Sequence, residues 1–387
     1  MIKPLTSLRF LFAFMVFGSH IQFFDAATYP RYAKWYELII GEGFIGVSFF
    51  FILSGFILSL NYDERLLSRR VSFREFWVAR IARVYPLHLV TLLLALGFMF
   101  YSAEPYAGPF ENMATGLNVL FTNATLLQAF IPEMGYYFSY NWPSWSISDE
   151  MFFYFAFPFI VFLLVRNKLL LRFGWVLFLA VPYLMQVSQE EEFHKLFYIN
   201  PFFRLVDFLV GIALHQVYKQ GFVGRAYRSR LGATVLEVLA LASFVAVFHF
   251  HLDFAIVYRY SCYYWLPIAF VILSFSYQRG YISTLLSGRT MVLLGEISFS
   301  FYLIHQLVIR WLKYENDQRG LFDNMYVLAA LMFVLSMGLS YLLHRYVEMP
   351  CNHYIKARYK RSRFAPVPPL AAPAVADVPV AEAIPAP

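Results

Sequence analysis

Long apolar runs, separated by short polar or basic segments, recur along most of the chain and restrict the folds open to it. A run of about 20 apolar residues can cross the roughly 30 Å hydrocarbon core of a bilayer as a helix. About ten runs approach that length, near residues 5–24, 43–61, 84–103, 145–165, 173–188, 200–218, 232–249, 259–277, 293–312 and 324–345. Only 14% of the residues are charged and 60% are hydrophobic, which is unlike a soluble domain. The sequence therefore predicts an all-α fold, a polytopic membrane bundle of about ten transmembrane helices.

The distribution of positive charge indicates how such a bundle would be oriented. If the N-terminus is cytoplasmic, the inner segments hold about three times as many of the Lys and Arg residues as the outer ones. Because Lys and Arg concentrate in cytoplasmic loops, we expect both termini in the cytoplasm. Orientation also accounts for the net charge of +7, so we expect no nucleic-acid partner.

The character of the chain changes after residue 350. We expect residues 1–350 to form one membrane domain, and residues 351–387, which are basic and then Pro/Ala-rich, to form a disordered cytoplasmic tail. The first apolar run is long enough to span and is interrupted by Arg9, so we expect a retained helix rather than a cleaved signal peptide. Cys262 and Cys351 have no companion spacing that would indicate a disulfide or a metal site.

The first run, from Leu5 to Phe24, contains two residues that do not belong in lipid, Arg9 and His20. On a helix they share one face, about 20° apart, and lie roughly 16 Å apart along the axis. A charge within a membrane span normally faces the interior of a bundle or a wet cavity. We therefore expect both side chains to point into a functional site.

A segment rich in arginine follows the second run. The inner loop expected from Asn61 to Arg83 contains several Arg and no Lys. Arg80 and Arg83 would share one helix face, and the planar guanidinium group suits bidentate binding of phosphate. A positive loop that contacts anionic lipid is the general alternative. The absence of Lys favours a phosphate site for this pair.

Two further segments carry polar residues within apolar surroundings. In the second run, Ser54 is either a substrate-lining residue or one of several small residues that let helices pack closely. Near the outer end of the fourth run, Glu150 would lie at a depth similar to that of His20, which makes a histidine–carboxylate pair possible. The alternative is a solvated acid at the membrane surface. For Arg204 and Asp207, one turn apart in the sixth run, we expect an internal ion pair, and for His305 a packed, hydrogen-bonded helix residue.

Taken in order, these segments resemble the acyltransferase-3 family of integral membrane acyltransferases. The resemblance extends from about Leu5 to Pro350 and rests on six motifs in order along the chain. They are Arg9 with ten residues before His20, GEGFIGVSFFFILSGF, Arg80-x-x-Arg83 before Tyr85-Pro86, WSISDEMFFYFAFP, RLVDFLVGIAL and ISFSFYLIH.

The resemblance implies transfer of an acyl group, often acetyl, from cytoplasmic acyl-CoA to a hydroxyl of a glycan, a lipid-linked saccharide or another envelope molecule. By motif match, His20 would be the catalytic base, oriented by Glu150, with Arg9 as a further functional residue. Arg80 and Arg83 would meet the CoA phosphates, and we place Ser54 with them in donor binding. The resemblance also implies ten spans in the bacterial inner membrane, surrounded by lipid, and a mechanism without a metal. The hydrolase-like domain often fused in this family is not expected here.

Two other functions fit parts of the pattern. A transporter could use intramembrane Arg, His and Glu as a proton relay. A structural membrane component could use the same residues for helix packing. Neither explains an inner arginine pair together with an outer His and Glu.

Overall fold

The computed structural model describes residues 1–24, 26–102, 113–166, 174–221, 227 and 229–363. Every regular element in these ranges is a helix. A helix lies at each of the ten expected runs, with the bounds α1 (Lys3–Ser19), α3 (Gly46–Leu67), α4 (Phe73–Ser102), α7 (Ser144–Arg166), α9 (Trp175–Val187), α10 (Pro201–Lys219), α11 (Arg230–His249), α13 (Trp265–Ser276), α15 (Arg289–Arg319) and α16 (Met325–Leu343). The all-α prediction is confirmed.

Shorter helices connect these long ones. They are α2 (Pro30–Trp35), α5 (Met113–Ala124), α6 (Met134–Tyr137), α12 (Ile256–Arg259), α14 (Tyr281–Leu286) and α17 (Met349–Arg363). Single turns of tighter or wider helix lie between them, among them Gly41–Ile45 before α3 and His344–Glu348 between α16 and α17.

Length and composition single out the helices that could cross a membrane. In the described part of the chain, six helical segments are long and apolar enough, or up to seven if a pair bent by 50° at Asn200 forms one span. Helices α9 and α13 are apolar but shorter. The count of ten spans and the cytoplasmic position of both termini stay predictions.

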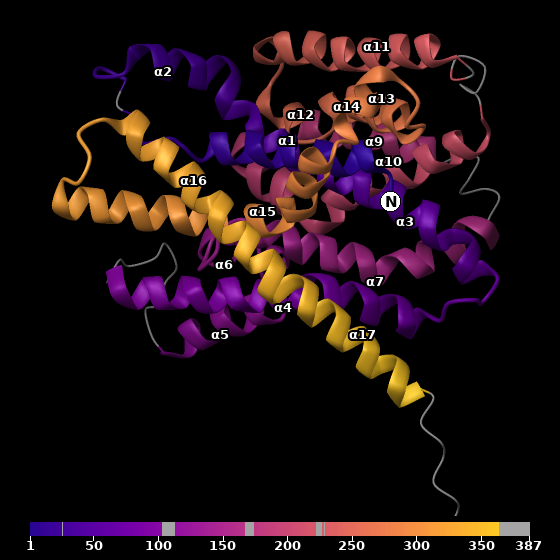
Figure 1. Ribbon diagram of the computed structural model, residues 1–387, viewed down its shortest axis with the longest axis horizontal. Coiled ribbons are helices and arrows are strands. Elements are labelled where there is room, and N and C mark those ends of the chain that lie inside the picture. The colour runs from indigo at the N-terminus through magenta and orange to yellow at the C-terminus, as the bar shows by residue number, and fades with distance from the viewer. Residues whose placement is uncertain (25, 103–112, 167–173, 222–226, 228, 364–387) are drawn as a thin grey trace, which may run out of the picture.

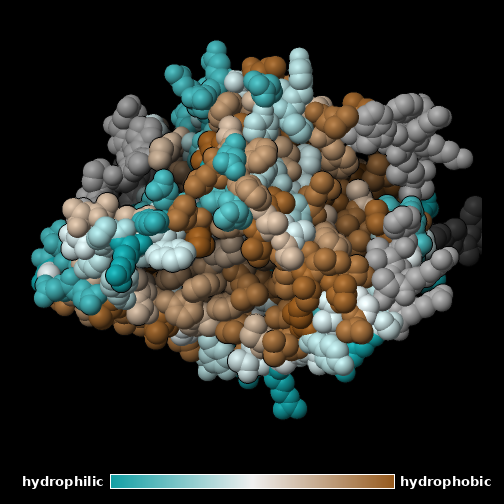
Figure 2. Space-filling view, turned by 90° about the horizontal axis from the view of Figure 1, so that it is seen from above, coloured by the Kyte–Doolittle hydropathy of each residue, from teal (hydrophilic) through white to brown (hydrophobic). Residues whose placement is uncertain are grey.

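Apolar side chains dominate the surface seen in Figure 2. Brown atoms spread across the middle and lower right of this face, while teal atoms gather at the left margin and along the top. Individual residues on the outside of the bundle, such as Leu266 and Leu93, are 83% and 66% exposed. Large exposed apolar side chains of this kind are expected where helices face lipid rather than water.

Helix α1 is held between two partners that approach its backbone closely. The turn Gly41–Ile45 packs on one side of α1, and α15 packs on another. A Cβ atom on Gly43 would lie 1.9 Å from the Met15 carbonyl oxygen, and one on Gly295 would lie 1.9 Å from that of Thr6. Only glycine fits at either contact, and small residues of this kind let helix backbones approach closely.

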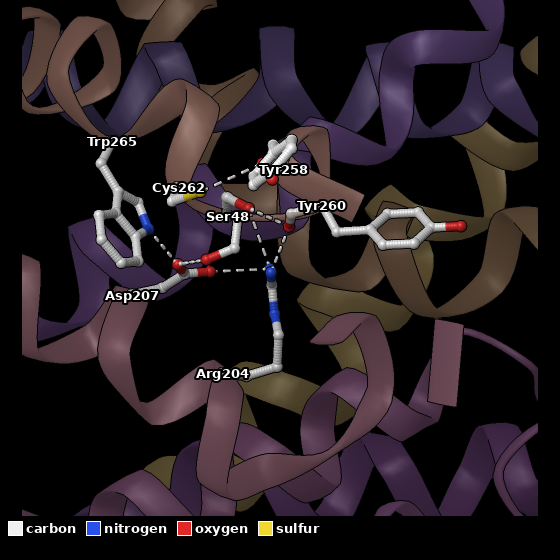
Figure 3. A network of polar contacts seen from close by, with 8 residues as sticks. Ser48, Arg204, Asp207, Tyr258, Tyr260, Cys262 and Trp265 are labelled. Carbon is white, nitrogen blue, oxygen red and sulfur yellow. Dashed lines mark hydrogen bonds and ion pairs between the residues drawn. The ribbon is translucent and has the colours of Figure 1, made fainter. Parts of the chain in front are cut away.

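A buried ion pair fixes α10 to its neighbours (Figure 3). Arg204 and Asp207 are both 0% exposed, with their charged groups 2.9 Å apart. The Arg204 guanidinium also donates to Ser48 Oγ in α3, at 3.0 Å, and to the Tyr260 carbonyl. Asp207 accepts from the Trp265 indole in α13. The internal ion pair expected from the sequence is confirmed, and it joins three helices.

The inner arginine segment is mostly helical, which differs from the expected loop. Helices α3 and α4 extend toward each other, so that only residues 68–72 connect them. Their extensions are anchored by Leu66 and Phe76, which are fully or almost fully buried. Arg80 and Arg83 therefore lie on α4 itself, where their positions are fixed by helix packing.

The chain does not leave the bundle at residue 350. Residues 351–363, which we expected to be disordered, belong to α17, and this helix packs along α4. Figure 1 shows α16 and α17 following one another as a long diagonal across the molecule. The expected domain boundary falls inside this helix, and residues 364–387 lie outside the described part of the chain.

Candidate functional site

A cavity of about 410 Å³ lies among α1, α3, α4, α7, α15 and the junction of α16 with α17. Five of the six residues predicted for the site line it, namely Arg9, Ser54, Arg80, Arg83 and Glu150. They come from four different helices and are up to 141 positions apart in the chain. Met1 and Asn352 also line the cavity, which therefore reaches the end of the bundle where the chain begins.

Three guanidinium groups line this cavity. Arg9 comes from α1, and Arg80 and Arg83 come from α4. Among the described residues, none of the three forms an ion pair with a carboxylate. The Nε atom of Arg80 is buried and has no hydrogen-bond partner in the described structure. All three arginines are half-buried. Guanidinium groups without carboxylate partners are suited to binding an anion, and phosphate matches the arginine fork.

Aromatic rings hold the Arg80 side chain in place. Its guanidinium carbon lies 5.5 Å from the ring centroid of Tyr62 and 5.8 Å from that of Tyr154. The Tyr62 hydroxyl also accepts a hydrogen bond from Arg80 at 3.4 Å. Cation–π contacts of this kind orient a guanidinium group without neutralising its charge. Arg80 is thus positioned and still able to bind an anion.

Glu150 supplies a negative charge to the same cavity. One of its oxygens accepts hydrogen bonds from the Tyr154 hydroxyl and from Ser54 Oγ, the latter at 3.3 Å. Two further acids, Glu296 and Glu348, also line the cavity. The cavity therefore places a carboxylate from α7 against a hydroxyl from α3 close to three cations.

His20 lies apart from this group. It follows the last residue of α1 and is not among the residues that line the cavity. Its Nδ1 atom lies 2.9 Å from the Val16 carbonyl oxygen and 3.1 Å from Nε2 of His305, a fully buried residue of α15. No described residue bonds to its other ring nitrogen, Nε2.

The expected pairing of His20 with Glu150 is not formed. Glu150 is oriented toward Ser54 and Tyr154, whereas α1 packs against α15 and brings His20 to His305. That expectation rested on placing the two residues at a similar depth in the bundle. Depth alone, however, does not determine which helices pack against each other. In the structure the packing of α1 against α15 keeps His20 away from Glu150.

Tyr302 connects the cavity to the histidine pair. It lines the cavity, its hydroxyl lies 2.7 Å from Ser146 Oγ, and its ring centroid lies 5.9 Å from that of His305. The rings of His305 and His20 have centroids 5.0 Å apart. The arrangement is thus a cavity lined by three arginines at one end of α1 and a histidine pair at the other, with a tyrosine between them.

Sequence reasoning missed three residues of this arrangement: Tyr154, Tyr302 and Asn352. It expected His305 to be a packed, hydrogen-bonded helix residue, which is confirmed, but it did not anticipate the contact of His305 with His20. A usable signal existed for Tyr154, which follows Glu150 by one helical turn, and for His305, which follows Tyr302 by three residues. Asn352 was missed because the residues after 350 were assigned to a tail. Among the described residues, no three His, Cys, Asp or Glu side chains gather closely enough to hold a metal ion.

Comparison with known proteins gives the class of chemistry. The acyltransferase-3 family model, described as an acyltransferase domain, matches residues 4–345. The chain is 30% identical over 384 residues to the acyltransferase MdmB of Streptomyces mycarofaciens, covering 92% of this chain and 93% of MdmB. It is 23% identical over 364 residues to the O-acetyltransferase OatA of Staphylococcus aureus strain NCTC 8325. That match covers 87% of this chain and 56% of OatA, so the chain spans about half the length of this relative. No solved structure matches the chain.

Proposed function

The chain belongs to the acyltransferase-3 family, and from this premise we propose that it transfers an acyl group from acyl-CoA to a hydroxyl of an envelope molecule. The acyl group is acetyl, the acceptor is a glycan or lipid-linked saccharide, and the protein acts in the bacterial inner membrane. The name of the relative OatA, an O-acetyltransferase, supports a hydroxyl acceptor and an acetyl group.

The observation that carries this proposal is the cavity with its three arginines. Acyl-CoA is an anionic donor with several phosphate groups. Arg9, Arg80 and Arg83 line the cavity and form no ion pair with a carboxylate among the described residues. Arg80 and Arg83 bind the phosphates, while Ser54 and Glu150 contact the rest of the donor. Because Met1 and Asn352 line the same cavity, the donor enters from the end that carries the N-terminus, which we place in the cytoplasm.

His20 acts as the catalytic base at the other end of α1. Its Nε2 atom takes the proton of the acceptor hydroxyl as the oxygen attacks the thioester carbonyl carbon. The bond from carbonyl carbon to sulfur breaks, and the imidazolium returns the proton to the leaving sulfur. Roughly 16 Å of helix separates Arg9 from His20, so the extended arm of the donor passes Tyr302 to bring its thioester to the histidine.

Glu150 and Arg9 act at the donor end in this scheme. Glu150 holds Ser54 and Tyr154, and Tyr154 in turn packs against the Arg80 guanidinium. Arg9 adds the third positive charge from α1. Both residues therefore prepare the cavity for the donor rather than orienting His20.

Transfer of label from acetyl-CoA tests this function. Membranes that contain the protein are incubated with acetyl-CoA labelled in its acetyl group, and label in the envelope glycan fraction is compared with that from membranes lacking the protein. We expect label to move into that fraction and free CoA to appear in equal amount. If neither acetyl-CoA nor longer acyl-CoA donors give transfer above the background of membranes lacking the protein, the proposal is wrong.

A further inference from the structure

His305 has no part in the scheme above, although it lies directly against the proposed base. It is 0% exposed in the interior of α15, and its ring packs against Phe301 and Phe17 with centroids 5.9 and 6.1 Å away. Its Nε2 atom faces Nδ1 of His20 at 3.1 Å. Because the two imidazole rings bond to each other, one of these nitrogen atoms must donate a hydrogen and the other must accept it.

Two backbone carbonyl groups decide the proton positions. His20 Nδ1 lies 2.9 Å from the Val16 oxygen, and His305 Nδ1 lies 3.2 Å from the Phe301 oxygen. A carbonyl oxygen can only accept, so each Nδ1 carries a hydrogen and each neutral ring leaves its Nε2 without one. If the hydrogen were on Nε2 instead, each Nδ1 lone pair would face a carbonyl oxygen, and neither contact would be a hydrogen bond.

This assignment sets the direction of the bond between the rings. His20 donates its Nδ1 hydrogen, shared between the Val16 oxygen and the lone pair of His305 Nε2. The Nε2 atom of His20 then carries the free lone pair that a general base needs. The proton state required of His20 follows from its neighbours rather than from a carboxylate.

We propose that His305 is a positioning residue for His20, accepting its Nδ1 hydrogen and holding Nε2 ready to take the acceptor's proton. This inference rests on the proposed role of His20 as base. As Nε2 takes the hydroxyl proton, His20 becomes a cation and its Nδ1–H becomes a stronger donor to His305. The charge is stabilised by a neutral acceptor, so no second ionised group has to be buried beside it.

Two substitutions of similar polarity separate this role from mere packing. His305→Gln places an amide oxygen near the position of Nε2, where it can accept from His20. In His305→Asn the shorter side chain ends near the position of Nδ1 and cannot reach. We expect His305→Asn to lower kcat roughly 10- to 100-fold, the effect of losing one hydrogen bond to a charged group, with KM for acetyl-CoA unchanged. His305→Gln is expected to retain most of kcat.

The assay measures release of free CoA and label transfer at varied concentrations of labelled acetyl-CoA, in membranes with equal amounts of protein. His88→Asn serves as the control, because His88 is also fully buried on a helix and bonds through Nε2 to a carbonyl group, at 2.8 Å, outside the cavity. We expect this variant to retain kcat.

The activities of the two His305 variants decide whether His305 acts as a hydrogen-bond acceptor for His20. Normal kcat in His305→Asn overturns the inference, and so does equal loss in His305→Gln and His305→Asn. If His305→Asn does not fold, His305→Gln alone decides, since a folded but inactive Gln variant contradicts the acceptor role. His20→Ala is measured alongside: if it keeps normal transfer, the proposed role of His20 fails as well, whereas its inactivity confines any failure to His305.

Discussion

At the scale of single residues, the charged groups inside this bundle follow two different patterns. Arg204 and Asp207 neutralise each other (Figure 3). Arg204 also donates hydrogen bonds to Ser48 and to the Tyr260 carbonyl, and Asp207 accepts one from Trp265. The three arginines of the cavity have no carboxylate within ion-pair distance among the described residues. The first pattern joins helices, and the second leaves charge available to a ligand.

Removing one partner of the buried pair should therefore be severe. We expect Asp207→Ala to lower the free energy of unfolding by about 3–5 kcal/mol, because it leaves the Arg204 charge buried and unpaired. The apolar double variant Arg204→Met/Asp207→Leu should lose less. Denaturant titration in mixed micelles measures both. The control is Glu192→Ala, which removes only a half-exposed partner of Lys195. Equal stability of Asp207→Ala and the wild type would contradict this account.

Most residues of the candidate site could be predicted individually, but the way they combine could not. Arg9, Arg80, Arg83 and Glu150 are conspicuous because charge is expensive within apolar runs, and all four line one cavity. The partner of His20 depends on which helix packs against α1. Nothing in the spacing along the chain specifies that neighbour, so His305 replaced the carboxylate that we expected.

At the scale of helices, α1 is placed by two close backbone contacts. Its neighbours approach through Gly43 and Gly295, where a Cβ atom would overlap with carbonyl oxygens of α1. These contacts fix the height and rotation of the helix that carries both Arg9 and His20. The small residues of this segment could be recognised in the sequence, although the partner of each could not.

Gly295→Ala should accordingly destabilise the protein. The added methyl group has to displace α1 or α15, so we expect a lower melting temperature and reduced transfer activity. Gly338→Ala is the matched control, because Gly338 also lies within a helix, α16, and has nothing within 4 Å of its Cβ position. That variant should be as stable as the wild type or slightly more so. A melting temperature of Gly295→Ala equal to that of Gly338→Ala would show that the close contact is absent.

Helix α17 gives a second test at this scale. Its residues Met349 and Asn352 line the cavity, and it packs along the helix that carries Arg80 and Arg83. We expect a chain that stops after Arg363 to keep its KM for acetyl-CoA, and a chain that stops after Pro350 to show a higher one. The comparison is made at equal amounts of folded protein. If both truncated chains have the same KM as the wild type, α17 takes no part in donor binding.

At the scale of the whole molecule, hydropathy predicted the helices well and their boundaries poorly. A helix lies at each expected run because about 20 apolar residues in a membrane have few other ways to satisfy their backbone. The connection between α3 and α4 and the residues after 350 were misassigned because polar, basic sequence does not distinguish a loop from an exposed helical extension. Leu66 and Phe76 are buried against neighbouring helices and hold these extensions in the bundle. The sequence alone does not show which residues will be buried in this way.

The whole-molecule account assigns donor binding to one end of α1 and chemistry to the other. Acetyl-CoA binding and acetyl transfer, both measured on the same purified preparations, test this division most directly. The set contains the wild type, His20→Ala, Arg80→Ala/Arg83→Ala, and the control Arg70→Ala/Arg345→Ala, which removes two exposed arginines outside the cavity. We predict that His20→Ala binds acetyl-CoA but does not transfer, that Arg80→Ala/Arg83→Ala loses both, and that the control keeps both. Normal binding by Arg80→Ala/Arg83→Ala, or normal transfer by His20→Ala, would contradict the account.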